Sequence, residues 1–142
     1  MSHEDVQRAI LNNDHHAMDD SMAKKGLHIN AAVDSSGGSA LNYAAWAGSE
    51  VCAEHLLEGR ADPDQQNQWG STGLLSAAAN GHVGSARLLL EAGADPRHKD
   101  KDGFTALDLA KRRNHHEVVR LLVPCPAISP PARQAQFLFI IF

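Results

Sequence analysis

The chain has 142 residues, of which 43% are hydrophobic and 21% charged, and its formal net charge is −4. This balance fits one globular domain or one stack of repeats, and it excludes a disordered chain. The negative charge argues against a nucleic-acid partner, because a phosphate-binding face needs clustered lysines and arginines. The polar start of the chain predicts no signal peptide and no membrane partner, so we expect a cytoplasmic protein, with the nucleus as an alternative.

Residues 4–25 predict an atypical first pair of helices. Ile10 and Leu11 are expected to supply the apolar side of the first helix, and Met18 and Met22 that of the second. Acidic residues early in the second helix and two lysines just before Gly26 suit the helix dipole.

A repeat of 33 residues follows. Gly37, Gly70 and Gly103 are separated by this interval, and the surrounding hydroxyl, leucine and alanine positions keep step with them. The matching positions are Ser39, Thr72 and Thr105; Leu41, Leu74 and Leu107; Ala44, Ala77 and Ala110; and Leu56, Leu89 and Leu122. The interval predicts an all-α solenoid of stacked helix-turn-helix units, because a single pair of helices cannot bury both of its faces.

Within one period, the hydroxyl residue is placed to cap a short alanine-rich helix, and a second helix rich in leucine follows a glycine turn. Gly93 is placed to end that second helix in the left-handed conformation. Arg60 holds the same place one repeat earlier, where Gly59 beside it could make the turn instead. Cys52 is expected to be a small buried hydrophobic residue. In the last repeat Lys111 replaces an alanine, which predicts a charged terminal face.

The motifs at residues 70–82 (GSTGLLSAAANGH) and 88–95 (LLLEAGAD) resemble the ankyrin-repeat family. The resemblance covers about residues 4–123 as four repeats, the first one partial, and it implies β-turn or hairpin loops between the helix pairs. We therefore expect residues 1–123 to form one repeat domain whose last repeat is a polar cap. The family's proline and histidine near the start of the first helix are absent here, so we expect lower stability than in a consensus array. The size is similar to that of small four-repeat inhibitors in the family.

The resemblance also implies a non-enzymatic module, an adaptor, scaffold or inhibitor, that binds a protein through loop tips and the inner face of the first helices. The residues of this chain at those positions form the predicted partner-binding surface. They are Tyr43, Trp46, Gln68, Trp69, Ser71, Asn80, Lys101, Asp102, Phe104, Arg112 and Arg113.

All four aromatic residues of the repeats, Tyr43, Trp46, Trp69 and Phe104, fall on this surface and none falls on a core position. Large rings at solvent-facing positions are typical of interface anchors. The alternative for any single ring is that it covers the first helix of a neighbouring repeat.

We expect no catalytic site, no metal, no cofactor and no small-molecule substrate, because neither a nucleophile elbow nor a phosphate-binding loop occurs. The adjacent pair His15 and His16 should diverge by about 100° on a helix and bind no common ion, as should the pair His115 and His116. His82 and His115 occupy the family's structural histidine position.

Residues 124–142 form a proline-rich tail with an apolar end, which we expect to be disordered and without a selected role. The alternatives are docking onto the last repeat or insertion into a partner. A monomer is expected. The alternative for the whole chain is a fragment, or a form with an alternative terminus, of a longer ankyrin-repeat regulatory protein.

Overall fold

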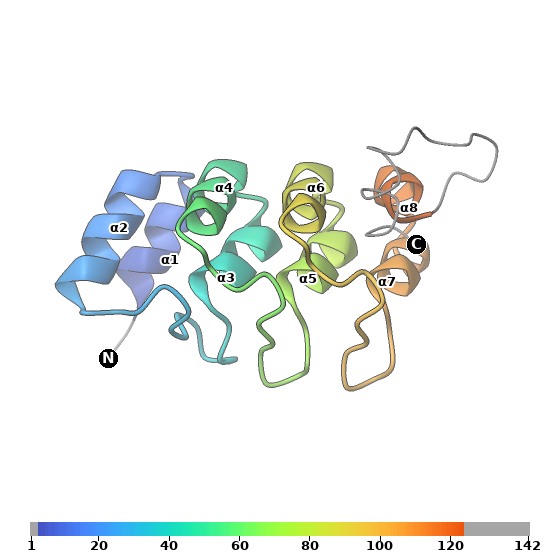
Figure 1. Cartoon of the computed structure of the whole chain (residues 1–142), viewed down its shortest axis with the longest axis horizontal. Coiled ribbons are helices and arrows are strands. Elements are labelled where there is room, and N and C mark those ends of the chain that lie inside the picture. Colours follow the sequence, from blue (N-terminus) through green and yellow to red (C-terminus); the bar gives the residue numbers. More distant parts are fainter. Residues whose placement is uncertain (1–2, 124–142) are drawn as a thin grey trace.

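The computed structural model describes residues 3–123, which form eight helices that pair in chain order. The pairs are α1 (Glu4–Leu11) with α2 (His15–Lys24), α3 (Ala40–Ala47) with α4 (Glu50–Glu58), α5 (Gly73–Asn80) with α6 (Val83–Glu91), and α7 (Ala106–Arg112) with α8 (His116–Leu122). Figure 1 shows the pairs side by side in one row, with the loops after α2, α4 and α6 projecting to the same side. This is the predicted all-α solenoid of helix pairs. The predicted tail, residues 124–142, lies outside the described residues.

The first helix of each full repeat begins directly after the predicted hydroxyl residue, which is its N-cap. Ser39, Thr72 and Thr105 each accept a hydrogen bond from the backbone N–H three residues on, which satisfies one of the free donors of the first turn. At Thr105 the cap is reciprocal, because the Asp108 carboxylate also accepts from the Thr105 N–H at 3.0 Å. These hydrogen bonds lower the pKa of Asp108 below its ordinary value.

The core is made of alanines on the first helices and leucines on the second. Ala44, Ala77 and Ala110 are fully buried, and their small side chains let α3, α5 and α7 pack against one another. Leu89 is fully buried on α6, and Cys52 is buried on α4 as predicted. Burial, with a smaller contribution from two nearby aspartates, raises the pKa of the Cys52 thiol from 9.0 to about 11.

The first helix pair stacks on the rest as an atypical repeat. Ile10, Met18 and Met22 are buried as predicted, but Leu11 is 55% exposed and the prediction for it is wrong. Val6 and Ile10 already form the buried side of α1, and the residue after Ile10 turns about 100° away from that side.

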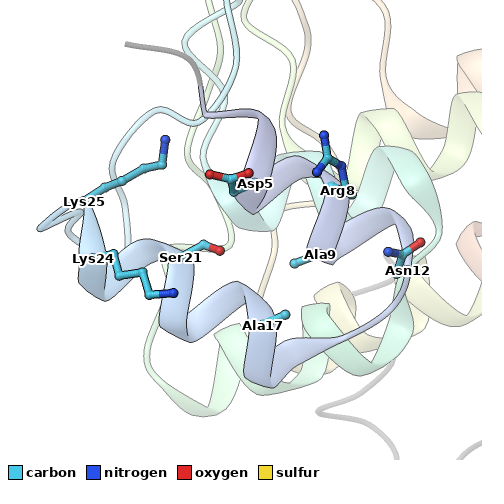
Figure 2. Close-up of a pocket in the computed structure, with 8 residues that line it drawn as sticks. All are labelled: Asp5, Arg8, Ala9, Asn12, Ala17, Ser21, Lys24 and Lys25. Carbon is cyan, nitrogen blue, oxygen red and sulfur yellow. The ribbon is translucent and has the colours of Figure 1, made fainter.

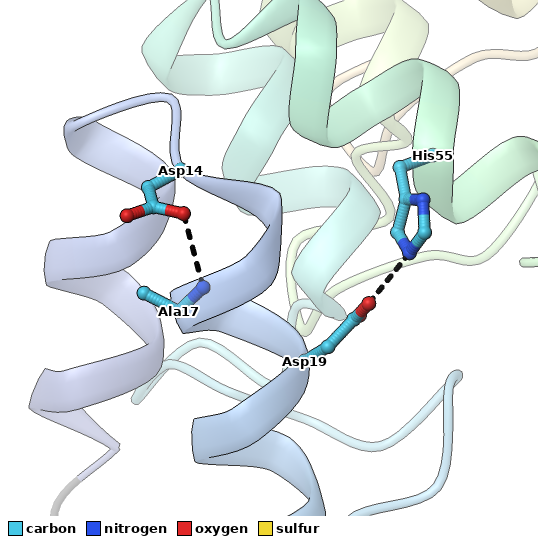
Figure 3. Close-up of polar contacts among 4 residues, drawn as sticks. All are labelled: Asp14, Ala17, Asp19 and His55. Carbon is cyan, nitrogen blue, oxygen red and sulfur yellow. Dashed lines mark hydrogen bonds and ion pairs between the residues drawn. The ribbon is translucent and has the colours of Figure 1, made fainter.

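Figure 3 shows two polar contacts of this first repeat. The Asp14 carboxylate caps α2 by accepting from the Ala17 N–H at 3.0 Å, and the Asp19 carboxylate meets His55 Nε2 of α4 at 2.7 Å. The His15 ring lies 4.0 Å from that of His16 and 4.8 Å from that of His55, centroid to centroid, so the expected divergence of His15 and His16 is not seen. No group of His, Cys, Asp or Glu able to hold a metal ion occurs within residues 3–123.

Each repeat is fastened to the one before it by a polar side chain at the start of its second helix. His82 Nε2 lies 3.1 Å from the Trp46 carbonyl oxygen, and His115 Nε2 lies 2.9 Å from that of Ala79. Ser49 occupies the same place one repeat earlier and donates its hydroxyl to the Ile10 carbonyl. The predicted structural role of the two histidines is therefore confirmed by these contacts.

Backbone geometry repeats along with the sequence. Gly37, Gly70 and Gly103 have φ angles of 80°, 72° and 85°, so all three adopt the left-handed conformation in their loops. Arg60 also adopts it, with φ at 67°, whereas Gly59 has φ at −78°. The arginine itself therefore makes the turn after α4. No helix of the described residues is long and apolar enough to cross a membrane.

Candidate protein-binding surface

The loops before α3, α5 and α7 share one internal brace. In each loop a carboxylate or amide oxygen accepts backbone N–H groups from two and four residues further on. The acceptor is Asp34 in the first loop, Asn67 in the second and Asp100 in the third, at distances of 2.8 to 3.0 Å. Together the loop residues 34–38, 67–71 and 100–104 form what we term the loop row. The brace fixes each tip without using the outward-facing side chains.

Main-chain hydrogen bonds also join neighbouring tips of the loop row. The Gln68 N–H donates to the Ser36 carbonyl at 2.8 Å, and the Lys101 N–H donates to the Trp69 carbonyl at 3.0 Å. His98 Nε2, which lies just before the third loop, is 2.8 Å from the Gly70 carbonyl oxygen of the second. The row is therefore one connected edge, which Figure 1 shows projecting from the helices.

Three of the four predicted anchor rings surround one pocket between this edge and the first helices. Tyr43 and Trp46 lie on the same side of α3, with ring centroids 5.4 Å apart and ring planes inclined by 43°. Trp69 reaches the pocket from the loop of the next repeat. The pocket has a volume of about 190 Å³ and is lined by Tyr43, Trp46, Trp69, Asp34, Ser36, Asn42 and Asn67, which together we term the aromatic pocket.

The two tryptophans of the aromatic pocket are solvent-exposed, Trp46 by 52% and Trp69 by 58%. Tyr43 is half-buried and packs against the core. It therefore lines the pocket as a predicted anchor and also covers the helices beneath it, as in the alternative interpretation. Asn42 is buried and donates from Nδ2 to the Gln65 carbonyl at 2.9 Å, which ties the pocket to the loop after α4.

The fourth ring, Phe104, does not line the aromatic pocket and has a different neighbour. The guanidinium of Arg112 lies over the Phe104 ring, 4.5 Å from its centroid, as a cation–π pair within the chain. Arg112 occupies the position of Trp46 two repeats later in the 33-residue register. Three of the four rings therefore line the aromatic pocket, and the fourth, Phe104, is covered by Arg112 instead.

The remaining predicted residues are spread along the same edge. Gln68, Lys101 and Asp102 are exposed at tips of the loop row, and Arg113 is exposed at the end of α7. Ser71 is half-buried, with its N–H bound by the brace of its own loop. Asn80 donates from Nδ2 to the Ser76 carbonyl at 3.1 Å and faces the Trp46 carbonyl at 3.4 Å, so it also links two repeats.

Three of the polar residues of the aromatic pocket were not predicted from the sequence. Asp34, Asn42 and Asn67 line it beside the rings. The signal for two of them was present, because a carboxylate or amide recurs at the 33-residue interval three positions before each loop glycine. Asp34 is the one charged residue among the lining residues of the pocket.

A second hollow lies at the N-terminal end of the row of helices, between α1 and α2, and Figure 2 shows the side chains around it. Its volume is about 430 Å³, and its lining residues are Asp5, Arg8, Ala9, Asn12, Ala17, Ser21, Lys24 and Lys25. Charges of both signs line it and no aromatic ring does, so it lacks the features of an interface anchor site.

A row of stacked helix pairs with a braced edge of loops defines a solenoid repeat protein. A family model described as ankyrin repeats, in three copies, matches residues 41–133, and the chain belongs to the ankyrin-repeat family. A search among curated proteins found no match. Ankyrin repeats are generally protein–protein interaction modules, and the fold is a non-catalytic interaction fold.

Proposed function

We propose that this chain binds a protein partner, as an adaptor, scaffold or inhibitor without enzymatic activity, through the loop row and the exposed side of α3, α5 and α7. The observation that carries the proposal is the exposure of Trp46 and Trp69 around one pocket. Rings that leave more than half of their surface in water gain the hydrophobic free energy of burial when a partner covers them.

The connected backbone of the loop row supports the same proposal. When loops become ordered on binding, the entropy that they lose makes the free energy of binding less favourable. The loop row is already ordered in the folded chain, so this cost of binding is small. Lys101, Asp102 and Arg113 are exposed along the same proposed surface, and interfaces with an aromatic centre commonly have a polar rim.

The test is affinity purification with the intact chain beside a Trp46→Ala, Trp69→Ala double variant. We expect the variant to lose its partners, because truncating an anchor residue of an interface costs about 2 kcal/mol or more. Folding should be retained, since Ala79 already occupies the position of Trp46 in the next repeat.

The matched control is a Leu11→Ala, Val51→Ala double variant. These two residues are also exposed apolar side chains, 55% and 42%, but neither lies on the proposed surface. The control should retain every partner. Retention of all partners by the tryptophan variant, or equal loss in both variants, would refute the proposed surface.

We propose further that the chain acts as a monomer and resides in the cytoplasm, with the nucleus as an alternative site. Light scattering of the purified chain and imaging of a tagged copy test these two points. A dimer whose formation depends on Trp46 and Trp69 would show that the proposed surface binds a second copy instead.

A further inference from the structure

The aromatic pocket has a chemistry that narrows the kind of group a partner presents to it. Tyr43, Trp46 and Trp69 offer ring surfaces, and the faces of such rings carry negative electrostatic potential. Asp34 adds a carboxylate, and the lining residues include neither lysine nor arginine. A group that is both positively charged and partly apolar could therefore pack against the rings and also pair with the carboxylate.

The carboxylate of Asp34 has one oxygen engaged and one available. Oδ1 accepts from the Ser36 N–H, the Ser36 hydroxyl and the Gly38 N–H at 2.9, 2.6 and 2.8 Å. Oδ2 accepts no hydrogen bond from any residue within 3–123. A single free oxygen suits the compact ammonium of lysine better than the planar guanidinium of arginine, which prefers two parallel acceptors.

The chain itself pairs a cation with a ring at another position of the same surface. In the last repeat Arg112 stands where α3 carries Trp46, and its guanidinium covers Phe104. That ring thus has a cation over it, whereas no lysine or arginine lines the aromatic pocket within residues 3–123. The pocket's missing component is a positive charge.

We propose that the aromatic pocket receives a lysine side chain of the protein partner, with the methylene chain against Tyr43, Trp46 and Trp69 and the ammonium at Asp34 Oδ2. This inference deepens the proposed function and rests on it. The volume of about 190 Å³ accommodates a side chain and excludes a folded element of the partner.

The test uses Nα-acetyl-lysine amide as the probe, followed by NMR of the indole N–H signals. Because Trp46 and Trp69 are the two tryptophans of the chain, both indole signals report on the pocket. The lysine probe should shift both signals with a dissociation constant in the millimolar range. The neutral norleucine analogue should shift them far less, and the arginine analogue should bind more weakly than lysine.

The carboxylate is tested by Asp34→Asn, with Asp100→Asn as the matched control. Asn67 braces the second loop with an amide oxygen, so asparagine at position 34 should keep the loop folded while removing the charge. We expect Asp34→Asn to weaken lysine binding by roughly fivefold, as for one partly exposed charge pair, and Asp100→Asn to leave it unchanged.

Equal shifts with norleucine, tighter binding of arginine, or no effect of Asp34→Asn would overturn the inference. The outcome is separable from that of the proposed function, because the probe needs no partner. Lysine selectivity together with full partner retention by the tryptophan double variant would refute the proposed function and leave only the preference of the pocket for a lysine side chain. Partner loss in that variant without lysine selectivity would refute only this inference.

Discussion

The left-handed turn at Arg60 predicts that this residue destabilises the chain. Glycine adopts the left-handed conformation without steric cost, whereas other L-residues lose about 1–2 kcal/mol there. Arg60 is exposed, and its side chain makes no hydrogen bond or ion pair with the described residues, so the side chain offers no compensation. Replacing it by glycine also makes the unfolded chain more flexible, which costs about 0.4–1 kcal/mol.

The two contributions leave a net gain of about 0.5–1 kcal/mol for Arg60→Gly, from the difference between backbone strain and chain entropy. For a domain of this size the gain corresponds to a rise in melting temperature of about 2–5 °C. Urea unfolding followed by circular dichroism measures it, as a higher midpoint at an unchanged m-value.

Two further variants identify the cause. Arg60→Ala removes the guanidinium but keeps the steric cost, so its stability should equal that of the original chain. Arg60→Asn should gain part of the effect, because asparagine tolerates this conformation and adopts it here at Asn13 and Asn114. If Arg60→Ala were as stable as Arg60→Gly, the reasoning from backbone strain would be wrong.

Three other predictions concern the helix packing, the buried thiol and a helix cap. Gly48→Ala should lower the free energy of unfolding by about 2–3 kcal/mol, because the new Cβ would lie 2.6 Å from His82 Nδ1. In the same urea assay Gly93→Ala should lower it by about 1 kcal/mol, because no atom lies within 4 Å of the new Cβ there. With the other cysteine replaced by serine, Cys52 should resist iodoacetamide at pH 8.5 until the chain is unfolded, and the stability should fall as the pH rises above about 9. Because the pKa of Asp108 is lowered on folding, Asp108→Asn should be less stable than the original chain at neutral pH, and urea midpoints should converge as the pH falls through the folded pKa.

The repeat and its caps could be predicted because one interval orders the whole chain. Residues 33 apart enter the same surroundings, so Thr72 and Thr105 were predicted to cap by their register alone, and both do. The left-handed turn at Arg60 could have been predicted from the same 33-residue interval. The Ala61 N–H donates to the Leu56 carbonyl as the Ala94 N–H does to that of Leu89, and this bond requires the residue before the alanine to be left-handed.

The aromatic pocket could not be derived from periodicity. Tyr43 and Trp46 belong to one repeat and Trp69 belongs to the next. Whether the three rings surround one pocket therefore depends on the distance between the loop row and the first helices, which the repeat interval does not give. The separation of Phe104 has a similar origin, because Trp69 precedes a loop glycine while Phe104 follows one, so the two rings occupy different positions of their loops. The surface as a site of binding stays a prediction.

The links between neighbouring tips of the loop row are made by main-chain atoms, from Gln68 to Ser36 and from Lys101 to Trp69. Any residue except proline can supply the donor N–H at positions 68 and 101. Mutations that change the outward side chains there would leave the backbone of the edge as it is. Recognition can therefore diverge through evolution at these tips while the folding stability of the array is conserved.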